Sequence, residues 1–168
     1  MIVTIWRHGE AGRASSDRLR ELTDQGVDDV GFGCIQFNGM CNDRGLPHPD
    51  MICHSPWVRT TQTADIISSA FSHAAIQVMD GLRPGSDART VDSALSKLLQ
   101  AAEQAPRHLV LVSHQPLVSR LVGHYLGEAG KVPPHSPGGL AALEMEHPGR
   151  GCARSLFWAM PPHYGAES

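Results

Sequence analysis

The size, composition and charge of the chain restrict the kinds of protein it can be. Its 168 residues suit one globular domain, and we expect a single domain over 1–168 with a loose tail from about residue 161. The balance of 14 Lys and Arg against 17 Asp and Glu gives a net charge of −3, which excludes the basic surplus of a general nucleic-acid binder. Any site for an anion must therefore be a small local concentration of positive groups.

Cysteine usage and hydropathy favour a cytoplasmic protein. The four cysteines lack paired CxxC spacing, and the amino terminus has no secretory signal pattern. No apolar run approaches the roughly 20 residues that a membrane-spanning helix needs. We therefore expect a cytoplasmic location and no membrane contact.

Short apolar runs alternate with longer mixed segments along the chain. This alternation predicts an α/β fold, a three-layer sandwich with helices on both faces of a mostly parallel central sheet. The first strand is predicted at 2–6, and the first helix opens near Leu22 or Thr23. Glycines weaken that helix by roughly 1 kcal/mol each relative to alanine, and the turn formers over 38–49 predict a loop.

The later elements continue this alternation. Further strands are predicted where short apolar runs recur, at 51–54, 76–79, 108–113, 140–146 and 154–159. Further helices are predicted where apolar residues recur at helical spacing, at 59–71, 91–102 and 116–126.

Two arginines and two histidines lie at the carboxyl ends of predicted strands. Arg7 and His8 follow the first strand, Arg59 begins the helix after the second, and His114 follows the apolar run LVLV and Ser113. In open α/β sheets, ligands bind beyond the carboxyl ends of the strands. If the sheet is parallel, these four side chains meet in one pocket.

These residue types suit a phosphoryl group. The two guanidiniums offer planar forks of N–H donors, and helix N-termini add backbone donors. One imidazole, with an ordinary pKa of about 6.5, can stay neutral and attack phosphorus, while the other donates to the phosphoryl oxygens. Gly9 lets the backbone turn sharply beside the ligand because it has no Cβ. The sequence RHG is thus a candidate phosphate cradle that holds a nucleophile.

Each of these residues also has a purely structural interpretation. His8 can be satisfied within a turn, Arg59 can be a solvated helix residue, and His114 can cap a helix. Ser55 either donates to phosphate or caps the helix that follows it. The joint placement of the two histidines and two arginines at three strand ends favours the functional interpretation.

The chain resembles the histidine phosphatase superfamily, the phosphoglycerate-mutase-like phosphatases, and within it the short bacterial phosphohistidine phosphatases of the SixA type. The segments that carry the resemblance are IWRHGEA, LRELTDQG, CHSPWVRTTQTA, LVLVSHQPLVSRLV and SLFWAMPP. The resemblance implies a phosphoglycerate-mutase-like fold, transient phosphorylation of His8, and binding of the phosphoryl group by Arg7, Arg59 and His114. It implies no metal and no organic cofactor.

The chain departs from many larger relatives at the acid that protonates the leaving group. Gln115 stands beside His114 where an aspartate stands in some of them, and DGLRPGSDA contains no glutamate. Asp87 is a candidate acid, and its alternative is an ordinary loop carboxylate. An imidazole leaving group needs little help, because protonated phosphohistidine departs as neutral imidazole. The departure favours a phosphoramidate substrate.

Three functions stay open at this point. The first is hydrolysis of phosphohistidine in a protein substrate, such as a phosphorelay or phosphotransfer protein, through phospho-His8. The second is hydrolysis of small phosphate esters, and the third is a phosphoprotein-binding module without turnover. In each case we expect the site to accept phosphate or sulfate. The loop 38–49 and Arg83 are candidate rim contacts for a partner.

Overall fold

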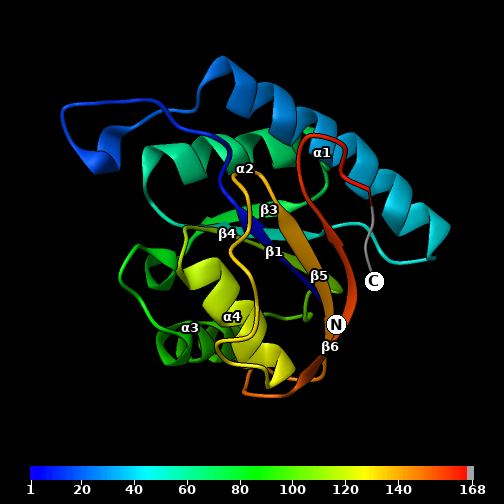
Figure 1. Cartoon of the computed structure of the whole chain (residues 1–168). Helices are drawn as coiled ribbons and strands as arrows, with labels where there is room; N and C mark the ends of the chain where they lie inside the picture. The colour runs from blue at the N-terminus through cyan, green and yellow to red at the C-terminus, as the bar shows by residue number, and fades with distance from the viewer. Residues whose placement is uncertain (166–168) are drawn as a thin grey trace.

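The computed structural model describes residues 1–165, within which six strands form one mixed sheet of order β3-β2-β4-β1-β5-β6 (Figure 1). The strands are β1 (Ile2–Arg7), β2 (Met51–His54), β3 (Ala75–Val78), β4 (His108–Ser113), β5 (Leu140–Met145) and β6 (Ala153–Ala159). β3, β2, β4 and β1 pair in parallel, whereas β5 and β6 pair antiparallel with their neighbours. The predicted mostly parallel sheet is confirmed.

Helices cover both faces of this sheet. α1 (Asp24–Asp43) and α2 (Val58–Ala70) pack on one face, and α3 (Ala88–Ala101) and α4 (Leu117–Leu126) pack on the other (Figure 1). The three-layer arrangement expected from the sequence is therefore confirmed. Within the described residues, no helix is both long enough and apolar enough to cross a bilayer.

The central strands contribute side chains to two separate cores. Val3 and Ile5 of β1 pack in the core beneath α3 and α4, whereas Trp6 packs in the core beneath α1 and α2. β4 alternates in the same way, with Leu109 in the first core and Val110 in the second. Because both faces of these strands are buried, their sequences are continuous apolar runs.

α1 is longer than the sequence predicted. Thr23 caps it by accepting a hydrogen bond from the Gly26 backbone N at 3.0 Å, and the helix continues to Asp43. The predicted loop is therefore wrong over 38–43 and is limited to 44–50. Met40 and Cys41 are buried against the sheet in this last turn, and that packing outweighs the low helix propensity of the glycines.

The predicted loose tail is wrong over 161–165. The Tyr164 side chain is 2 % exposed, and its hydroxyl donates to the carbonyl oxygen of Gly138 at 3.0 Å. Its ring lies edge-on to Phe32 of α1, with 6.2 Å between the ring centroids. This buried aromatic residue fixes the segment against α1. The remaining part of the predicted tail, 166–168, lies outside the described residues.

Candidate active site

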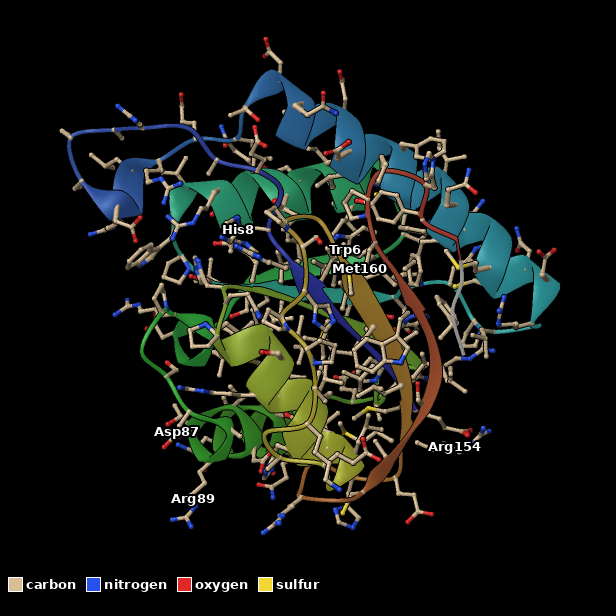
Figure 2. All side chains as sticks on the ribbon, in the orientation of Figure 1. Trp6, His8, Asp87, Arg89, Arg154 and Met160 are labelled. Atoms are coloured by element: carbon tan, nitrogen blue, oxygen red, sulfur yellow. The ribbon has the colours of Figure 1, made fainter. Side chains whose placement is uncertain are left out.

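The carboxyl ends of three neighbouring parallel strands meet at one edge of the sheet. Arg7 at the end of β1 pairs with Ser113 of β4, and His54 at the end of β2 pairs with Val112 of β4. His8 follows β1 directly, and His114 follows β4 directly. Figure 2 shows His8 just beyond the end of β1. The strand register thus brings both rings to the same edge.

The His8 ring is buried and oriented by the backbone beside it. Nδ1 lies 2.7 Å from the carbonyl oxygen of Gly9, which can only accept, so Nδ1 carries the proton. Nε2 therefore has the lone pair, and it accepts a hydrogen bond from Nε of Arg59 at 3.0 Å. Burial, and after it the charges of Arg59 and Arg7, lowers the pKa of His8 to about 4 against the opposing effect of the Gly9 bond. The ring is neutral at physiological pH.

Arg59 lies in the first turn of α2 and is buried. Besides its bond to His8, its guanidinium donates from NH1 to the backbone oxygen of Asp17 at 2.6 Å and from NH2 to the Asp17 carboxylate at 3.3 Å. Its Cζ lies 4.9 Å from the centre of the Trp57 ring, at cation–π distance. All three nitrogens of this guanidinium are thus held in place.

Arg7 approaches the same point from the end of β1. Its NH1 donates to the backbone oxygen of His135 at 2.5 Å, which fixes one side of the guanidinium. Its buried Nε has no hydrogen-bond partner within the described residues. An unpaired buried donor is costly, so this nitrogen favours an anionic ligand.

His114 is 2 % exposed, and its ring centroid lies 5.2 Å from that of His8. Its Nε2 lies 2.8 Å from the Ser55 hydroxyl, while its Nδ1 has no partner in residues 1–165. Burial, followed by the neighbouring His8 and Arg59, lowers the pKa of His114 to about 3. Ser55 therefore contacts His114, whereas the N-cap position of α2 belongs to Trp57.

The four predicted residues line one cavity of about 310 Å³. Gln115 lines it as well, together with Asp17 and Arg20, which sequence reasoning missed. Asp17 and Arg20 lie in the segment between β1 and α1, where no strand end or helical period draws attention to them. Their available signal was the concentration of arginines in that segment.

Gly9 is required by packing as well as by its position beside His8. A Cβ at this residue would lie 2.8 Å from the backbone oxygen of Gly26 and 3.0 Å from Cγ2 of Val30. The amide of Gly9 donates to the Thr63 hydroxyl at 3.2 Å. The close approach of α1 therefore supplies a second reason for glycine, which the sequence alone did not indicate.

Asp87 does not lie at the cavity. It is the N-cap of α3, where its carboxylate accepts hydrogen bonds at 2.8 Å from both the backbone N and the hydroxyl of Thr90. These bonds lower the pKa of Asp87, whereas an acid catalyst requires the opposite shift. The structure corrects the candidate acid to a helix cap.

Gln115 is also occupied by local bonding. Its side-chain oxygen accepts from the Ser119 backbone N at 3.1 Å, and its side-chain nitrogen donates to the Ser119 hydroxyl at 3.1 Å. It thus stabilises the first turn of α4. The position that carries an acid in some larger relatives holds no ionisable group here.

The two predicted rim contacts, the loop 38–49 and Arg83, lie in different places relative to the cavity. The loop that precedes β2 lies at the opposite edge of the sheet. Its last residue, Asp50, donates a hydrogen bond from its backbone N to the backbone oxygen of His108 at the start of β4. The loop 38–49 is therefore not a rim of this cavity. Arg83 pairs with Asp80 at 2.7 Å and adjoins the cavity through the lining residue Pro84.

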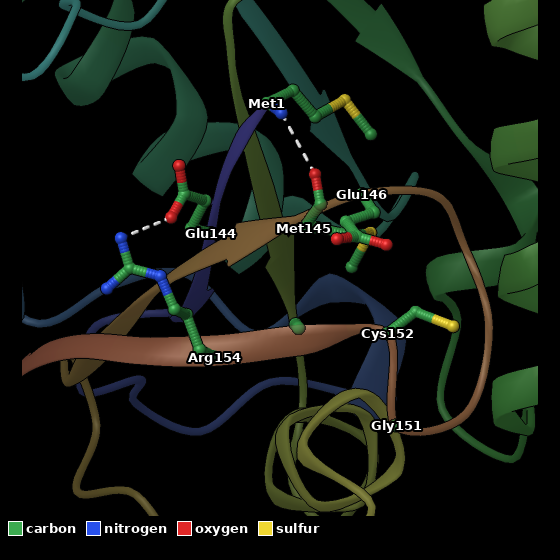
Figure 3. A pocket seen from close by; sticks show the side chains of 8 residues that line it. Met1, Glu144, Met145, Glu146, Gly151, Cys152 and Arg154 are labelled. Carbon is green, nitrogen blue, oxygen red and sulfur yellow. Dashed lines mark hydrogen bonds and ion pairs between the residues drawn. The ribbon is translucent and has the colours of Figure 1, made fainter.

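Two cavities of about 500 Å³ or more lie away from the paired histidines. One, of about 500 Å³, lies beside the β5–β6 hairpin, where the Met1 amino group donates to the backbone oxygen of Met145 at 2.9 Å and Arg154 pairs with Glu144 (Figure 3). The other, of about 630 Å³, is lined mainly by prolines, Trp158 and Met160. Within 1–165, no three His, Cys, Asp or Glu side chains are grouped to hold a metal ion.

Comparison with known proteins agrees with the geometry. No protein-family model matches the chain. A phosphohistidine phosphatase SixA homolog of Haemophilus influenzae is 27 % identical over 136 residues, which cover 79 % of this chain and 81 % of that protein. The chain is similar to SixA-type histidine phosphatases. This likeness supports the predicted resemblance to the histidine phosphatase superfamily and the predicted phosphatase activity.

Solved structures show the same fold. Protein histidine phosphatase SixA complexed with tungstate has a TM-score of 0.75 and 24 % identity, covering 96 % of this chain and 97 % of that chain. A mycobacterial glucosyl-3-phosphoglycerate phosphatase complexed with VO3 has a TM-score of 0.65 and 16 % identity, covering 96 % and 97 % of the two chains. The phosphoglycerate-mutase-like fold expected for this SixA-like chain is therefore confirmed.

Proposed function

We propose that the protein is a phosphohistidine phosphatase that acts on a protein substrate through a covalent phospho-His8 intermediate. The observation that carries this proposal is the neutral His8 ring, whose Nε2 lone pair adjoins a cavity lined by Arg7, Arg59 and His114. A nucleophile, two guanidiniums and a second imidazole are the groups that phosphoryl transfer to histidine needs.

In the first step, Nε2 of His8 attacks phosphorus as the bond between phosphorus and the substrate imidazole breaks. In the free protein, Nε of Arg59 donates a hydrogen bond to Nε2 of His8. During the reaction this N–H must donate to a phosphoryl oxygen instead, because Nε2 needs its lone pair for the new bond. The unpaired Nε of Arg7 supplies a second donor. The substrate ring is protonated when it is bound, so it leaves as neutral imidazole and takes its proton with it.

In the second step, water attacks phosphorus and the bond from phosphorus to Nε2 of His8 breaks. The products are inorganic phosphate and the neutral His8 ring, still protonated on Nδ1 and bonded to Gly9. His114 donates to the phosphoryl oxygens when Ser55 donates to its Nε2, because its proton then lies on the unpaired Nδ1.

The leaving group is where phosphoramidates and alkyl phosphates differ. Asp87 lies outside the cavity. Of the two carboxylates that line it, Asp17 has its pKa lowered by Arg20 and Arg59, and Glu10 accepts a hydrogen bond from the Thr23 hydroxyl at 2.9 Å. An alkoxide leaving group requires a proton from an acid, whereas imidazole does not. This favours phosphohistidine over small alkyl phosphates.

The test measures phosphate release from a histidine peptide phosphorylated with phosphoramidate. We expect turnover by the wild-type protein, a loss of at least a thousandfold in His8→Asn, and a labile phosphate adduct in the mass of rapidly quenched wild type. His73→Asn, at an exposed histidine, is the matched control. Turnover by His8→Asn would defeat the nucleophile assignment, and stoichiometric binding without turnover would favour a binding module.

A further inference from the structure

The segment between β1 and α1 forms a closed loop beside the cavity. An isolated bridge pairs Ala11 with Leu22, and the 3-10 helix η1 (Asp17–Leu19) lies between them (Figure 1). Arg20 closes the loop from inside, donating from Nε to the Gly12 oxygen at 2.6 Å and from NH2 to the Ala11 oxygen at 3.1 Å. The hydrogen bonds of the Arg20 guanidinium thus hold the two ends of the loop together and fix the position of Asp17.

Asp17 lies between two guanidiniums. Its Oδ1 accepts from Arg20 at 3.0 Å, and its Oδ2 accepts from Arg59 at 3.3 Å. The backbone oxygen of Asp17 accepts from Arg59 at 2.6 Å. One residue therefore connects the clamped loop to the buried arginine of the cavity.

The contacts divide Arg59 into two edges. NH1 and NH2 form the outer edge, and both donate to Asp17. Nε and the second N–H of NH2 form the inner edge, which faces His8 because Nε donates to its Nε2 at 3.0 Å. A guanidinium has five N–H groups in fixed directions, so binding of the outer edge leaves the inner edge available to two phosphoryl oxygens once Nε no longer donates to Nε2 of His8. Asp17 does not compete with the phosphoryl group for those donors.

We propose that Asp17 is a positioning residue that holds Arg59 from its outer edge, so that Nε and NH2 face the phosphoryl group transferred to His8. This inference rests on the proposed function and assigns one residue to its geometry. Arg20 acts one step further away, because it fixes the loop and the carboxylate that hold Arg59. The loop is thereby part of the site although it supplies no nucleophile.

The proposal predicts that removal of the Asp17 carboxylate lowers kcat without raising KM. Removing the Asp17 carboxylate takes the outer partner from NH2 of Arg59, while NH1 keeps its bond to the Asp17 backbone oxygen. The guanidinium is then held less firmly, which weakens its alignment in the transition state and lowers kcat. The same change removes a negative charge from a cavity that binds a dianion, so substrate binding is not weakened. Asp17→Ala should therefore lower kcat about tenfold with an unchanged or lower KM. Asp17→Asn keeps an oxygen acceptor and should have an intermediate kcat.

The experiment measures kcat and KM for Asp17→Ala and Asp17→Asn with the phosphorylated histidine peptide, in the wild-type and Arg59→Lys backgrounds. Asp17 acts through the two edges of Arg59, so its removal should change kcat less than twofold when lysine replaces that arginine. Arg18→Ala, at an exposed position of the same loop, is the matched control and should match wild type. Thermal midpoints check that each variant is folded.

Three outcomes would overturn the inference. They are a wild-type kcat in Asp17→Ala, a rise in KM as large as the fall in kcat, and an undiminished Asp17→Ala effect in the Arg59→Lys background. If Asp17→Ala does not fold, the same outcomes in Asp17→Asn decide the matter. Failure of the proposed function is a separate result, because it appears as turnover in His8→Asn whatever Asp17 does.

Discussion

His8 is prepared for its proposed role by a backbone carbonyl and by burial. The Gly9 oxygen fixes the proton on Nδ1, and the surrounding apolar and cationic groups keep the ring neutral. Three further buried histidines, His108, His114 and His135, also have pKa values lowered to between about 3 and 4, chiefly by burial. The protein therefore folds with four imidazoles that resist protonation.

At the residue scale, this predicts the charge state of His8. A titration followed by NMR should give His8 a pKa below 5 in the free protein, with the resonance assigned from its absence in His8→Asn. Tungstate should raise that pKa, because an anion beside the ring favours its charged form. A pKa near 6.5 in the free protein would contradict the burial and charge environment described above.

The same four histidines predict how stability depends on pH. Each pKa is lower in the folded than in the unfolded protein, so the unfolded chain binds more protons below pH 6.5. Their contribution to the free energy of unfolding is therefore complete above about pH 6.5 and is lost as pH falls toward 4. Urea unfolding at pH 7.5, 6 and 5 should show a progressive decrease. His108→Gln should reduce that decrease, and a pH-independent stability would refute the prediction.

At the element scale, α1 shows that a glycine's effect depends on what its missing Cβ would meet. At Gly33, a Cβ would lie 2.6 Å from the ring of Tyr164, whose hydroxyl is bonded to Gly138. At Gly31, on the same helix, no atom lies within 4 Å. The absence of a Cβ at Gly33 therefore lets the Tyr164 ring pack against α1, whereas Gly31 only weakens the helix.

Alanine substitutions at these two glycines should act in opposite directions. Gly33→Ala should lower the free energy of unfolding by about 1–3 kcal/mol, because the Tyr164 ring must move and its hydrogen bond is strained. Gly31→Ala should raise it by about 0.5–1 kcal/mol through helix propensity alone. Chemical denaturation of the two variants measures both, and equal effects would show that Tyr164 does not limit the packing of α1.

At the scale of the whole molecule, the parallel register assembles the cavity from segments far apart in the chain. Alternating apolar runs predicted all six strands, and their carboxyl ends pointed to Arg7, His8, Arg59 and His114. The same reasoning could not find Asp17 and Arg20, because a loop closed by side-chain bonds to its own backbone has no sequence period. Nor could it exclude Asp87, since only coordinates distinguish a helix cap from an acid at the site.

The assembled cavity should make the stability of the whole protein depend on oxyanions. A ligand that binds only the folded state at 100 times its Kd adds about 2.7 kcal/mol to the free energy of unfolding, which is roughly 5–10 °C in Tm for a chain of this size. Tungstate should therefore raise the Tm of the wild type. Arg59→Ala should abolish the rise, because it removes a buried guanidinium that lines the cavity. Arg154→Ala should retain it, because Arg154 lies on β6 and pairs with Glu144. An equal shift in all three proteins would mean that the anion stabilises the fold without occupying the cavity.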